Sequence, residues 1–272
     1  MRRVRKAVIP AAGIGTRFLP ITKVVPKEIL PIGRKPVIQY VVEEAIASGI
    51  EEIIFIISPG KEMIVDYFRS DPVLESVLGE RGKREEIELL GRIPTCAKVS
   101  AVYQRQPLGL GHAVLCAKEA VGNEDFLVIL PDVVVDAKVP ACRQLIEVCG
   151  KAWGLLMEKV PREKVSFYGI VEVERVGNEL YQILGAVEKP SSETAPSDLS
   201  ILGRYLLPPD VFSCIEALTP TALGEIQLTE AIDRLTRQRP AYGAVCQGLL
   251  FDVGTPEGFM RAGRHYLDTD LP

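Results

Sequence analysis

KAVIPAAGIGTR, residues Lys6–Arg17, joins a short apolar run to a loop that contains Gly13 and Gly15. The apolar run over Lys6–Pro10 predicts a first β-strand. Glycines directly after a strand let the backbone come close to a ligand and turn its N–H groups toward anionic oxygens. A tight turn that requires a positive φ is the alternative explanation, and the G-x-G pattern alone does not decide between the two.

Two phosphate-binding patterns do not fit this loop. The dinucleotide fingerprint GxGxxG would need a glycine where the chain has Phe18. The P-loop pattern GxxxxGK[ST] is also absent. The residues beyond the loop therefore have to decide its meaning.

Those residues favour a phosphate ligand. Pro20, Pro26 and Pro31 prevent a regular helix, so we expect an extended segment that folds back on itself. The segment carries Arg17 and Lys27, and an arginine fork plus a lysine point charge beside a glycine loop suit a triphosphate. Two solvated surface cations are the alternative.

Outside this stretch, short apolar runs alternate with segments of helical period. The predicted strands are Glu52–Ser58, Val99–Tyr103, Phe126–Leu130, Trp153–Val160, Gly169–Val173 and Tyr181–Val187. The predicted helices are Pro36–Ser48, His112–Val121, Pro209–Ala217, Gln227–Arg237 and Pro256–Tyr266. Apolar strands separated by helices indicate a parallel sheet covered on both faces, in a three-layer α/β/α domain. Ligands of such sheets bind at the carboxyl ends of the strands, which makes Asp132 a further candidate.

The rest of the chain gives no sign of a second domain. The segment Asp71–Arg92 is charged and helical in pattern, and it is interpreted as an insertion between strands. No linker or internal repeat divides the chain, so we expect one domain over residues 1–272. The formal net charge of -4 gives no reason to expect nucleic acid. No run approaches the roughly 18–20 apolar residues of a membrane span, so we expect no membrane partner.

Cysteines and histidines do not indicate a reactive site. The six cysteines contain no CxxC pair, and free thiols in the cytoplasm are favoured over disulfides because nothing marks secretion. They are Cys96, Cys116, Cys142, Cys149, Cys214 and Cys246. His112 has no serine or cysteine beside it in a recognisable triad and is given no catalytic role. With only two histidines, a His-rich metal site is excluded.

The stretch GIGTRFLPITKVVPKEILPI, Gly13–Ile32, resembles the signature of the sugar nucleotidyltransferases. Its PKEILP part is typical of the bacterial UTP–glucose-1-phosphate uridylyltransferase branch. Further matching motifs are Lys35–Glu44, Gly109–Ala117, Leu130–Val133, Tyr168–Val171, Val187–Pro190, Gly203–Tyr205 and Gly224–Thr229. The resemblance covers nearly the whole chain, and it implies a Rossmann-like fold with a mixed, mostly parallel central sheet.

For the nucleotide, the resemblance implies that the backbone of Ala11, Ala12, Gly13 and Gly109 surrounds base and ribose. Gly15 and Thr16 would complete the nucleotide-binding loop. Gln104 matches the family's base-reading glutamine, since a side-chain amide can donate to and accept from a uracil edge at once. A polar residue that merely ends a strand is the alternative for this glutamine.

The same resemblance assigns a Mg²⁺ site to Asp132 and Asp252. Each acid follows an apolar run, and Mg²⁺ prefers one or two carboxylates together with substrate phosphate oxygens. A carboxylate that caps a turn is the commoner fate of such residues and remains the alternative.

On the sugar side, the resemblance implies that Lys189 holds the hexose phosphate and that Glu188 accepts sugar hydroxyls. Gly169 would lie against the sugar, and Glu28 would help to organise the pocket around Lys27. Without the resemblance, the neighbouring Glu188 and Lys189 would be interpreted as a surface salt bridge.

The activity implied is transfer of a uridylyl group from UTP to glucose 1-phosphate, with release of pyrophosphate. Catalysis would depend on Arg17, Lys27, Asp132 and Lys189, which bring two polyanions together. A thymidylyltransferase acting on the same sugar phosphate is one alternative, and a non-catalytic nucleotide-sugar sensor is another. The resemblance also implies a homo-oligomer, either a dimer or a tetramer.

Overall fold

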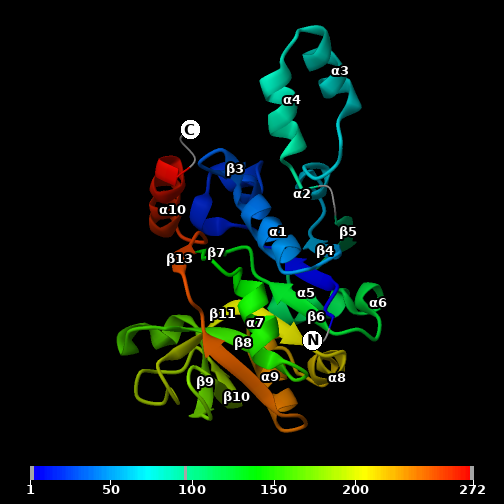
Figure 1. Cartoon of the computed structure of the whole chain (residues 1–272). Helices are drawn as coiled ribbons and strands as arrows, with labels where there is room; N and C mark the ends of the chain where they lie inside the picture. The colour runs from blue at the N-terminus through cyan, green and yellow to red at the C-terminus, as the bar shows by residue number, and fades with distance from the viewer. Residues whose placement is uncertain (1–2, 95–96, 270–272) are drawn as a thin grey trace.

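A nine-stranded sheet in the order β5-β4-β1-β6-β11-β8-β12-β10-β9 dominates the computed structural model, which describes residues 3–94 and 97–269 (Figure 1). Its parallel half consists of β5 (Lys98–Tyr103), β4 (Glu52–Ile57), β1 (Lys6–Pro10) and β6 (Phe126–Ile129). The other half consists of β11 (Leu199–Leu207), β8 (Trp153–Lys159), β12 (Ala241–Val245), β10 (Tyr181–Glu188) and β9 (Gly169–Arg175). The predicted α/β class is confirmed, and the sheet is mixed because β10 and β11 run against their neighbours.

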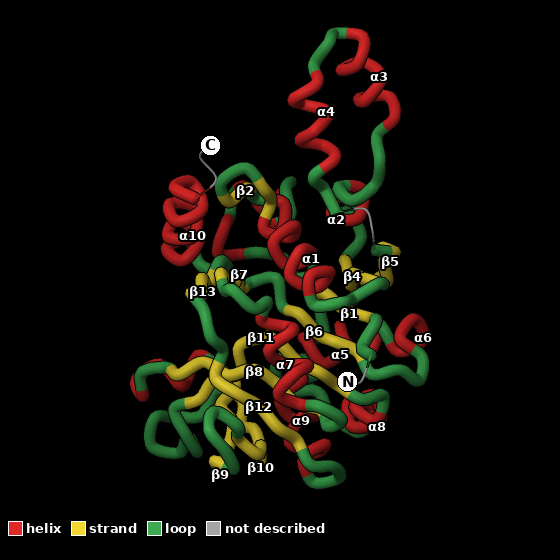
Figure 2. The backbone as a smooth tube through the Cα atoms, viewed as in Figure 1, coloured by secondary structure: helices red, strands yellow, loops and turns green. Residues whose placement is uncertain are grey.

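The parallel strands are apolar on both sides because both faces of the sheet are covered. In β4 every residue after Glu52 is buried. Ile53 and Phe55 pack with helices α1 (Val37–Ala47) and α7 (Ala141–Cys149). Ile54 and Ile56 pack on the opposite face with α5 (Gly109–Cys116), α8 (Asp210–Glu216) and α9 (Leu228–Thr236). The alternation follows from the two-residue period of a strand, which sends successive side chains to opposite faces. Figure 2 shows α1, α5, α7 and α9 around the strands of the sheet.

Most of the predicted elements are present, with small shifts at their ends. The predicted helix over His112–Val121 is two helices, α5 and α6 (Lys118–Val121), that meet at Ala117. The last predicted helix extends to Thr269 as α10 (Pro256–Thr269). Strands β11 and β12 were not predicted. Neither were the two small sheets, which β7 (Val133–Asp136) forms with β13 (Leu249–Asp252) and β2 (Pro31–Ile32) forms with β3 (Lys35–Pro36).

The segment from Arg17 to Ile29 differs from the prediction. The prolines do prevent a regular α-helix, but the backbone is not extended. It folds into three short 3₁₀ helices, η1 (Thr16–Phe18), η2 (Ile21–Lys23) and η3 (Lys27–Ile29). Because i→i+3 turns need fewer consecutive N–H donors than an α-helix, they fit between closely spaced prolines.

The charged insertion forms a helical arm. After the short α2 (Met63–Asp66), α3 (Pro72–Glu80) and α4 (Arg84–Gly91) make a hairpin that projects away from the sheet (Figure 1). Neither helix contains a buried residue. The arm therefore adds nothing to the core of this chain.

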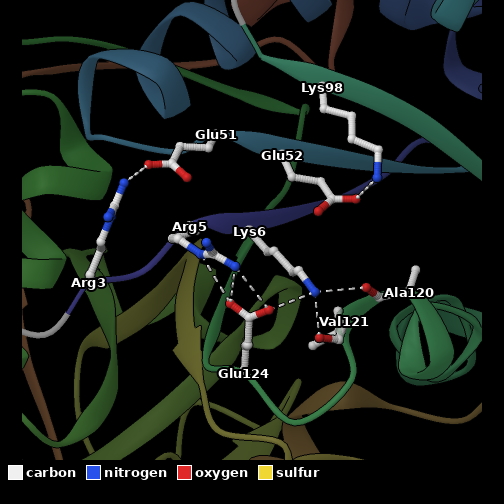
Figure 3. A network of polar contacts seen from close by, with 9 residues as sticks. All are labelled: Arg3, Arg5, Lys6, Glu51, Glu52, Lys98, Ala120, Val121 and Glu124. Atoms are coloured by element: carbon white, nitrogen blue, oxygen red, sulfur yellow. Dashed lines mark hydrogen bonds and ion pairs between the residues drawn. The ribbon is translucent and has the colours of Figure 1, made fainter.

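Ion pairs fasten the amino edge of the parallel strands (Figure 3). Lys6, at the start of β1, donates to the carbonyl oxygens of Ala120 and Val121 at 3.2 and 2.9 Å, and it pairs with Glu124 at 2.9 Å. These contacts fasten the start of β1 to the end of α6 and to the segment that leads into β6. A further 3₁₀ helix, η4 (Arg162–Phe167), precedes β9.

The described cysteines Cys116, Cys142, Cys149, Cys214 and Cys246 are all free, as predicted. Cys96 lies outside the described residues. Among the residues that the structure describes, no helix is long and apolar enough to cross a membrane.

Candidate functional site

The carboxyl ends of β1, β4, β5 and β6 lie at one edge of the sheet, because these strands are parallel neighbours. The chain leaves β1 into the Ala11–Gly15 loop, β5 into Gln104, and β6 into the turn that holds Asp132. Residues far apart in sequence therefore meet at this edge, as expected for an α/β sheet.

The two glycines of the opening loop have different roles. Gly15 has a φ of 72° and caps η1, where an added Cβ would lie 3.1 Å from Cγ2 of Thr22. Gly13 has no positive φ, and an added Cβ there would meet nothing within 4 Å. The tight-turn explanation therefore holds for Gly15, whereas open space lies beside Gly13. Thr16 begins η1 and is exposed.

Two cations extend from this loop toward the strand ends. Lys27, on η3, forms an ion pair with Oδ1 of Asp132. Arg17 is exposed, and its Nη1 donates to the carbonyl oxygen of Gly254 at 3.3 Å. Each predicted cation thus contacts a segment that carries Asp132 or Asp252, and Arg17 is at the same time exposed to solvent.

The small β7–β13 sheet brings the two candidate metal ligands together. Val133, directly after Asp132, pairs with Asp252. The carbonyl oxygen of Asp132 also accepts hydrogen bonds from the backbone N–H groups of Val253 and Gly254, at 2.7 and 3.2 Å. Loss of water contact and the neighbouring Asp132 charge raise the pKa of the Asp252 carboxyl, although the Gly254 N–H opposes the shift. Two carboxylates that the backbone brings this close together suit a cation.

The donor set fits Mg²⁺ better than a metal enclosed by protein ligands. No cluster of three or more His, Cys, Asp or Glu side chains suited to a metal occurs among residues 3–94 and 97–269. Mg²⁺ usually binds through one or two carboxylates and completes its shell with water and phosphate oxygens. The prediction of Asp132 and Asp252 as its ligands is compatible with this arrangement.

Gln104 is buried at the end of β5 and is held on its donor side. Its Nε2 donates to the carbonyl oxygen of Gly109 at 3.0 Å and lies 3.0 Å from Nδ1 of His112. Gly109 has a φ of 88°, and an added Cβ would lie 2.9 Å from the carbonyl oxygen of Ile226. His112 thus lies where it orients the glutamine.

The predicted sugar-side residues form a second group, on β9 and β10. Oε2 of Glu188 accepts a hydrogen bond from Thr229 at 2.6 Å, and an added Cβ on Gly169 would come within 3.2 Å of that same carboxylate oxygen. Lys189 is exposed and has a φ of 47°, a conformation that costs a non-glycine residue energy and that clusters at functional sites.

Tyr168 connects the two groups. Its carbonyl oxygen accepts the backbone N–H of Lys189 at 3.0 Å. Burial and the nearby charge of Asp252 raise the pKa of its hydroxyl, and the charge of Arg17 opposes this increase without reversing it. In the described part of the chain, no hydrogen bond or ion pair joins Lys189 to Lys27 or Asp132, so the predicted site residues form two separate groups.

Glu28 is only 1% exposed, and its partner is a residue that the sequence analysis missed. Its Oε2 accepts a hydrogen bond from Lys61 at 3.0 Å, while Oε1 is buried without a partner in the described residues. Burial raises the pKa of this carboxyl, and the charges of Lys61 and Lys27 oppose the increase. Within the sequence, Lys61 follows Pro59–Gly60 and looks like an ordinary turn lysine, so no local signal marks its role.

Comparisons with known proteins agree on one family. The family model described as nucleotidyl transferase matches residues 6–269. A curated relative from Bacillus subtilis (strain 168), named UTP–glucose-1-phosphate uridylyltransferase, is 44% identical over 262 residues, which is 96% of this chain and 90% of the relative.

Solved structures give the same result. A UTP-bound UGPase from Acinetobacter baumannii has a TM-score of 0.89 at 40% identity. The match covers 97% of this chain and 93% of the UGPase chain. An apo UDP-glucose pyrophosphorylase has a TM-score of 0.92 at 36% identity, with 98% and 100% of the two chains covered.

Proposed function

The chain belongs to the nucleotidyl transferase family, and on that premise we propose that it transfers a uridylyl group from UTP to glucose 1-phosphate. The products are UDP-glucose and pyrophosphate. The observation that carries this proposal is the meeting of Lys27, Asp132 and Asp252 at the sheet edge where the glycine loop begins. Relatives named for this activity, similar over nearly their whole length, support the choice of substrates.

The chain's own residues act by positioning and by charge. An oxygen of the sugar phosphate attacks the α-phosphorus of UTP, and pyrophosphate leaves from the opposite side. That oxygen is already ionised at neutral pH, so no general base is needed. Arg17 and Lys27 steady the leaving pyrophosphate, and Lys189 holds the attacking phosphate. Holding two polyanions in line is therefore the main task of the site.

Asp132 and Asp252 hold Mg²⁺ in this proposal. A bound ion would supply positive charge that offsets the charge of the substrate phosphates. Lys27 forms an ion pair with Asp132, which connects the proposed phosphate-binding cation to the proposed metal ligands.

Gln104 reads the base. Its Nε2 is engaged by Gly109 and is close to His112, which leaves Oε1 as the atom that accepts from a uracil N–H. The backbone of Ala11, Ala12, Gly13 and Gly109 surrounds base and ribose, while Gly15 and Thr16 lie on the phosphate side. Gly169 and Glu188 contact the sugar, and Glu28 supports the pocket from its buried position.

Other features of the protein are also proposals. The three-layer, Rossmann-like description of the fold is supported by helices on both faces of the sheet. Cytoplasmic location is supported by the free thiols of the described cysteines. A homo-oligomer is supported by apolar side chains that the arm exposes, at Val73, Leu74, Val77 and Leu89.

Pyrophosphate release tests the function. The protein with Mg²⁺ is supplied with each of several nucleoside triphosphates and hexose 1-phosphates, and the pair UTP and glucose 1-phosphate should give the highest rate. A protein that binds nucleotide sugars but releases no pyrophosphate with any pair would be a sensor, and the catalytic proposal would be wrong.

A further inference from the structure

Lys61 lies just beyond β4, at the carboxyl edge of the sheet, and its ammonium is fully used within the protein. Nζ donates to the carbonyl oxygens of Ala11 and Gly13 at 2.8 and 2.6 Å, and to Oε2 of Glu28 at 3.0 Å. An ammonium has three N–H donors, and here each has an acceptor. With its side chain only 11% exposed, Lys61 has no donor left for a substrate phosphate.

The two carbonyl contacts fix the orientation of the glycine loop. A trans peptide is planar, so the C=O of one residue and the N–H of the next point in opposite directions. The bonds after Ala11 and Gly13 are trans, since the cis bond of the described chain is Leu19–Pro20. When both carbonyls turn toward Lys61, the N–H groups of Ala12 and Ile14 must point away from it.

Those N–H groups are available for a ligand. In the described part of the chain, no residue accepts a hydrogen bond from the backbone N–H of Ala12, Gly13, Ile14 or Gly15. Ile14 is exposed, and the space beside Gly13 is open. Successive N–H groups that face one open side form a concave site for anionic or carbonyl oxygens.

We propose that Lys61 is a positioning residue for nucleotide binding, whose ammonium turns the Ala11–Ala12 and Gly13–Ile14 peptides so that their N–H groups face the nucleotide. The inference rests on the proposed function and assigns to the same site a residue that does not touch the substrate. Because the loop is held in its binding conformation beforehand, the nucleotide does not have to order it.

A simpler role for Lys61 would be to neutralise the buried carboxylate of Glu28. The two roles separate in a double-mutant cycle with Lys61→Met, Glu28→Gln and the double variant. Lys61→Met alone leaves Glu28 buried and unpaired, so its melting temperature should fall. The double variant has no buried unpaired charge, so its melting temperature should be close to that of the wild type. It should therefore stay folded at temperatures at which Lys61→Met is unfolded.

Binding of UTP is then measured by calorimetry with Mg²⁺ and without sugar phosphate, so that no turnover occurs. We expect Lys61→Met and the double variant to bind UTP about tenfold or more weakly, because the carbonyls that oriented the loop have lost their donors. Glu28→Gln alone should lose much less. In turnover, Lys61→Met should raise KM for UTP, while its kcat at saturating UTP should stay close to that of the wild type.

Lys6 provides a matched control at the start of β1, the strand whose far end leads into the loop that Lys61 contacts. It is similarly buried, with its side chain 13% exposed, and it too donates to two carbonyl oxygens and pairs with one glutamate (Figure 3). Lys6→Met should lower the melting temperature and leave the affinity for UTP unchanged.

Two results would overturn the inference while the proposed function stands. They are a Lys61→Met variant that binds UTP as tightly as the wild type, and a double variant that regains UTP affinity together with stability. A wild-type protein that binds no nucleotide would instead defeat the proposed function, and the inference with it.

Discussion

Arg204 is fully buried, and its guanidinium holds the turn that carries Asp132. Nη1 and Nη2 donate to the carbonyl oxygens of Leu130 and Val133 at 3.0 and 2.9 Å, on either side of that aspartate. Nε and Nη2 also bind the two oxygens of Glu44 at 2.9 and 2.8 Å, in a bidentate ion pair. The buried pair thus connects helix α1 to the candidate metal site.

Loss of Arg204 should be severe, because it leaves Glu44 buried without its countercharge. We expect Arg204→Met to lower the free energy of unfolding by about 3–5 kcal/mol, measured by urea denaturation. Arg204→Met with Glu44→Met should recover much of that loss, since both charges are gone. Equal stability of the single and double variants would contradict this explanation.

The same pair should make stability depend on pH. Burial by itself would raise the pKa of Glu44, but the charge and hydrogen bonds of Arg204 lower it overall below 4.5. A carboxyl with a lowered pKa in the folded state stabilises fully above its unfolded pKa, and this contribution is lost as the pH falls through the folded pKa. The double methionine variant should therefore lose less stability than the wild type below about pH 4.5.

Asp132 should be needed for turnover and dispensable for folding. Because its side chain is 42% exposed, Asp132→Asn should leave the melting temperature almost unchanged while pyrophosphate release falls by about a hundredfold or more. Asp198 offers a matched control, since it pairs with Lys159 at 3.2 Å and its side chain is 41% exposed. Asp198→Asn should keep full activity, and an active Asp132→Asn variant would remove the assigned role.

At the residue scale, sequence could identify side chains only where a motif carries them. Lys27 was predicted to bind the triphosphate and Asp132 to bind the metal, and the structure joins the two side chains in an ion pair. Lys61 and Arg204 were not predicted to have these roles, because a buried cation depends on acceptors that are distant in sequence. Glu44 was missed for the same reason, since on a helix it looks solvated until β11 is placed beneath it.

At the scale of the element, the turn into α5 has a steric requirement for glycine. Gly109 has a φ of 88°, and an added Cβ would lie close to backbone atoms of Ile226, the nearest at 2.9 Å. Gly109→Ala should shift the carbonyl that accepts from Gln104, so we expect a raised KM for UTP together with a lower melting temperature. Gly122→Ala is the control, because its φ of 66° is also positive but no atom lies within 4 Å of the added Cβ.

Steady-state kinetics and thermal melting of the two alanine variants test whether UTP binding depends on the turn at Gly109. Both should lose stability through the strained backbone, by about 1–3 kcal/mol. Only Gly109→Ala should change KM for UTP. Equal KM values for the two variants would show that the base-reading position does not depend on this turn.

The elements that could be predicted are those whose pattern is local. The buried parallel strands are continuous apolar runs, and the helices have clear ends at proline and glycine. β11 was missed although it is apolar, because an antiparallel strand inserted between β6 and β8 is a feature of topology and not of composition. The β7–β13 pair was missed because its strands have four residues each and are separated by more than a hundred positions.

At the scale of the whole molecule, the arm should be a contact between copies of the chain. Val73 is 75% exposed and Val77 is 38% exposed, one helical turn apart on α3. We expect Val73→Glu with Val77→Glu to reduce the assembly mass measured by light scattering, without a lower melting temperature of the monomer. Glu75→Gln on the same helix should leave the mass unchanged. An unchanged mass for the glutamate variant would exclude the arm as the interface.

The preference of the protein for UTP or dTTP tests the proposed uridylyl transfer. Initial rates of UDP-glucose or dTDP-glucose formation are measured with glucose 1-phosphate and Mg²⁺ at equal, subsaturating UTP or dTTP. A uridylyltransferase should convert UTP at a clearly higher kcat/KM than dTTP. A clear preference for dTTP, or no nucleotide sugar from either triphosphate, would contradict the account.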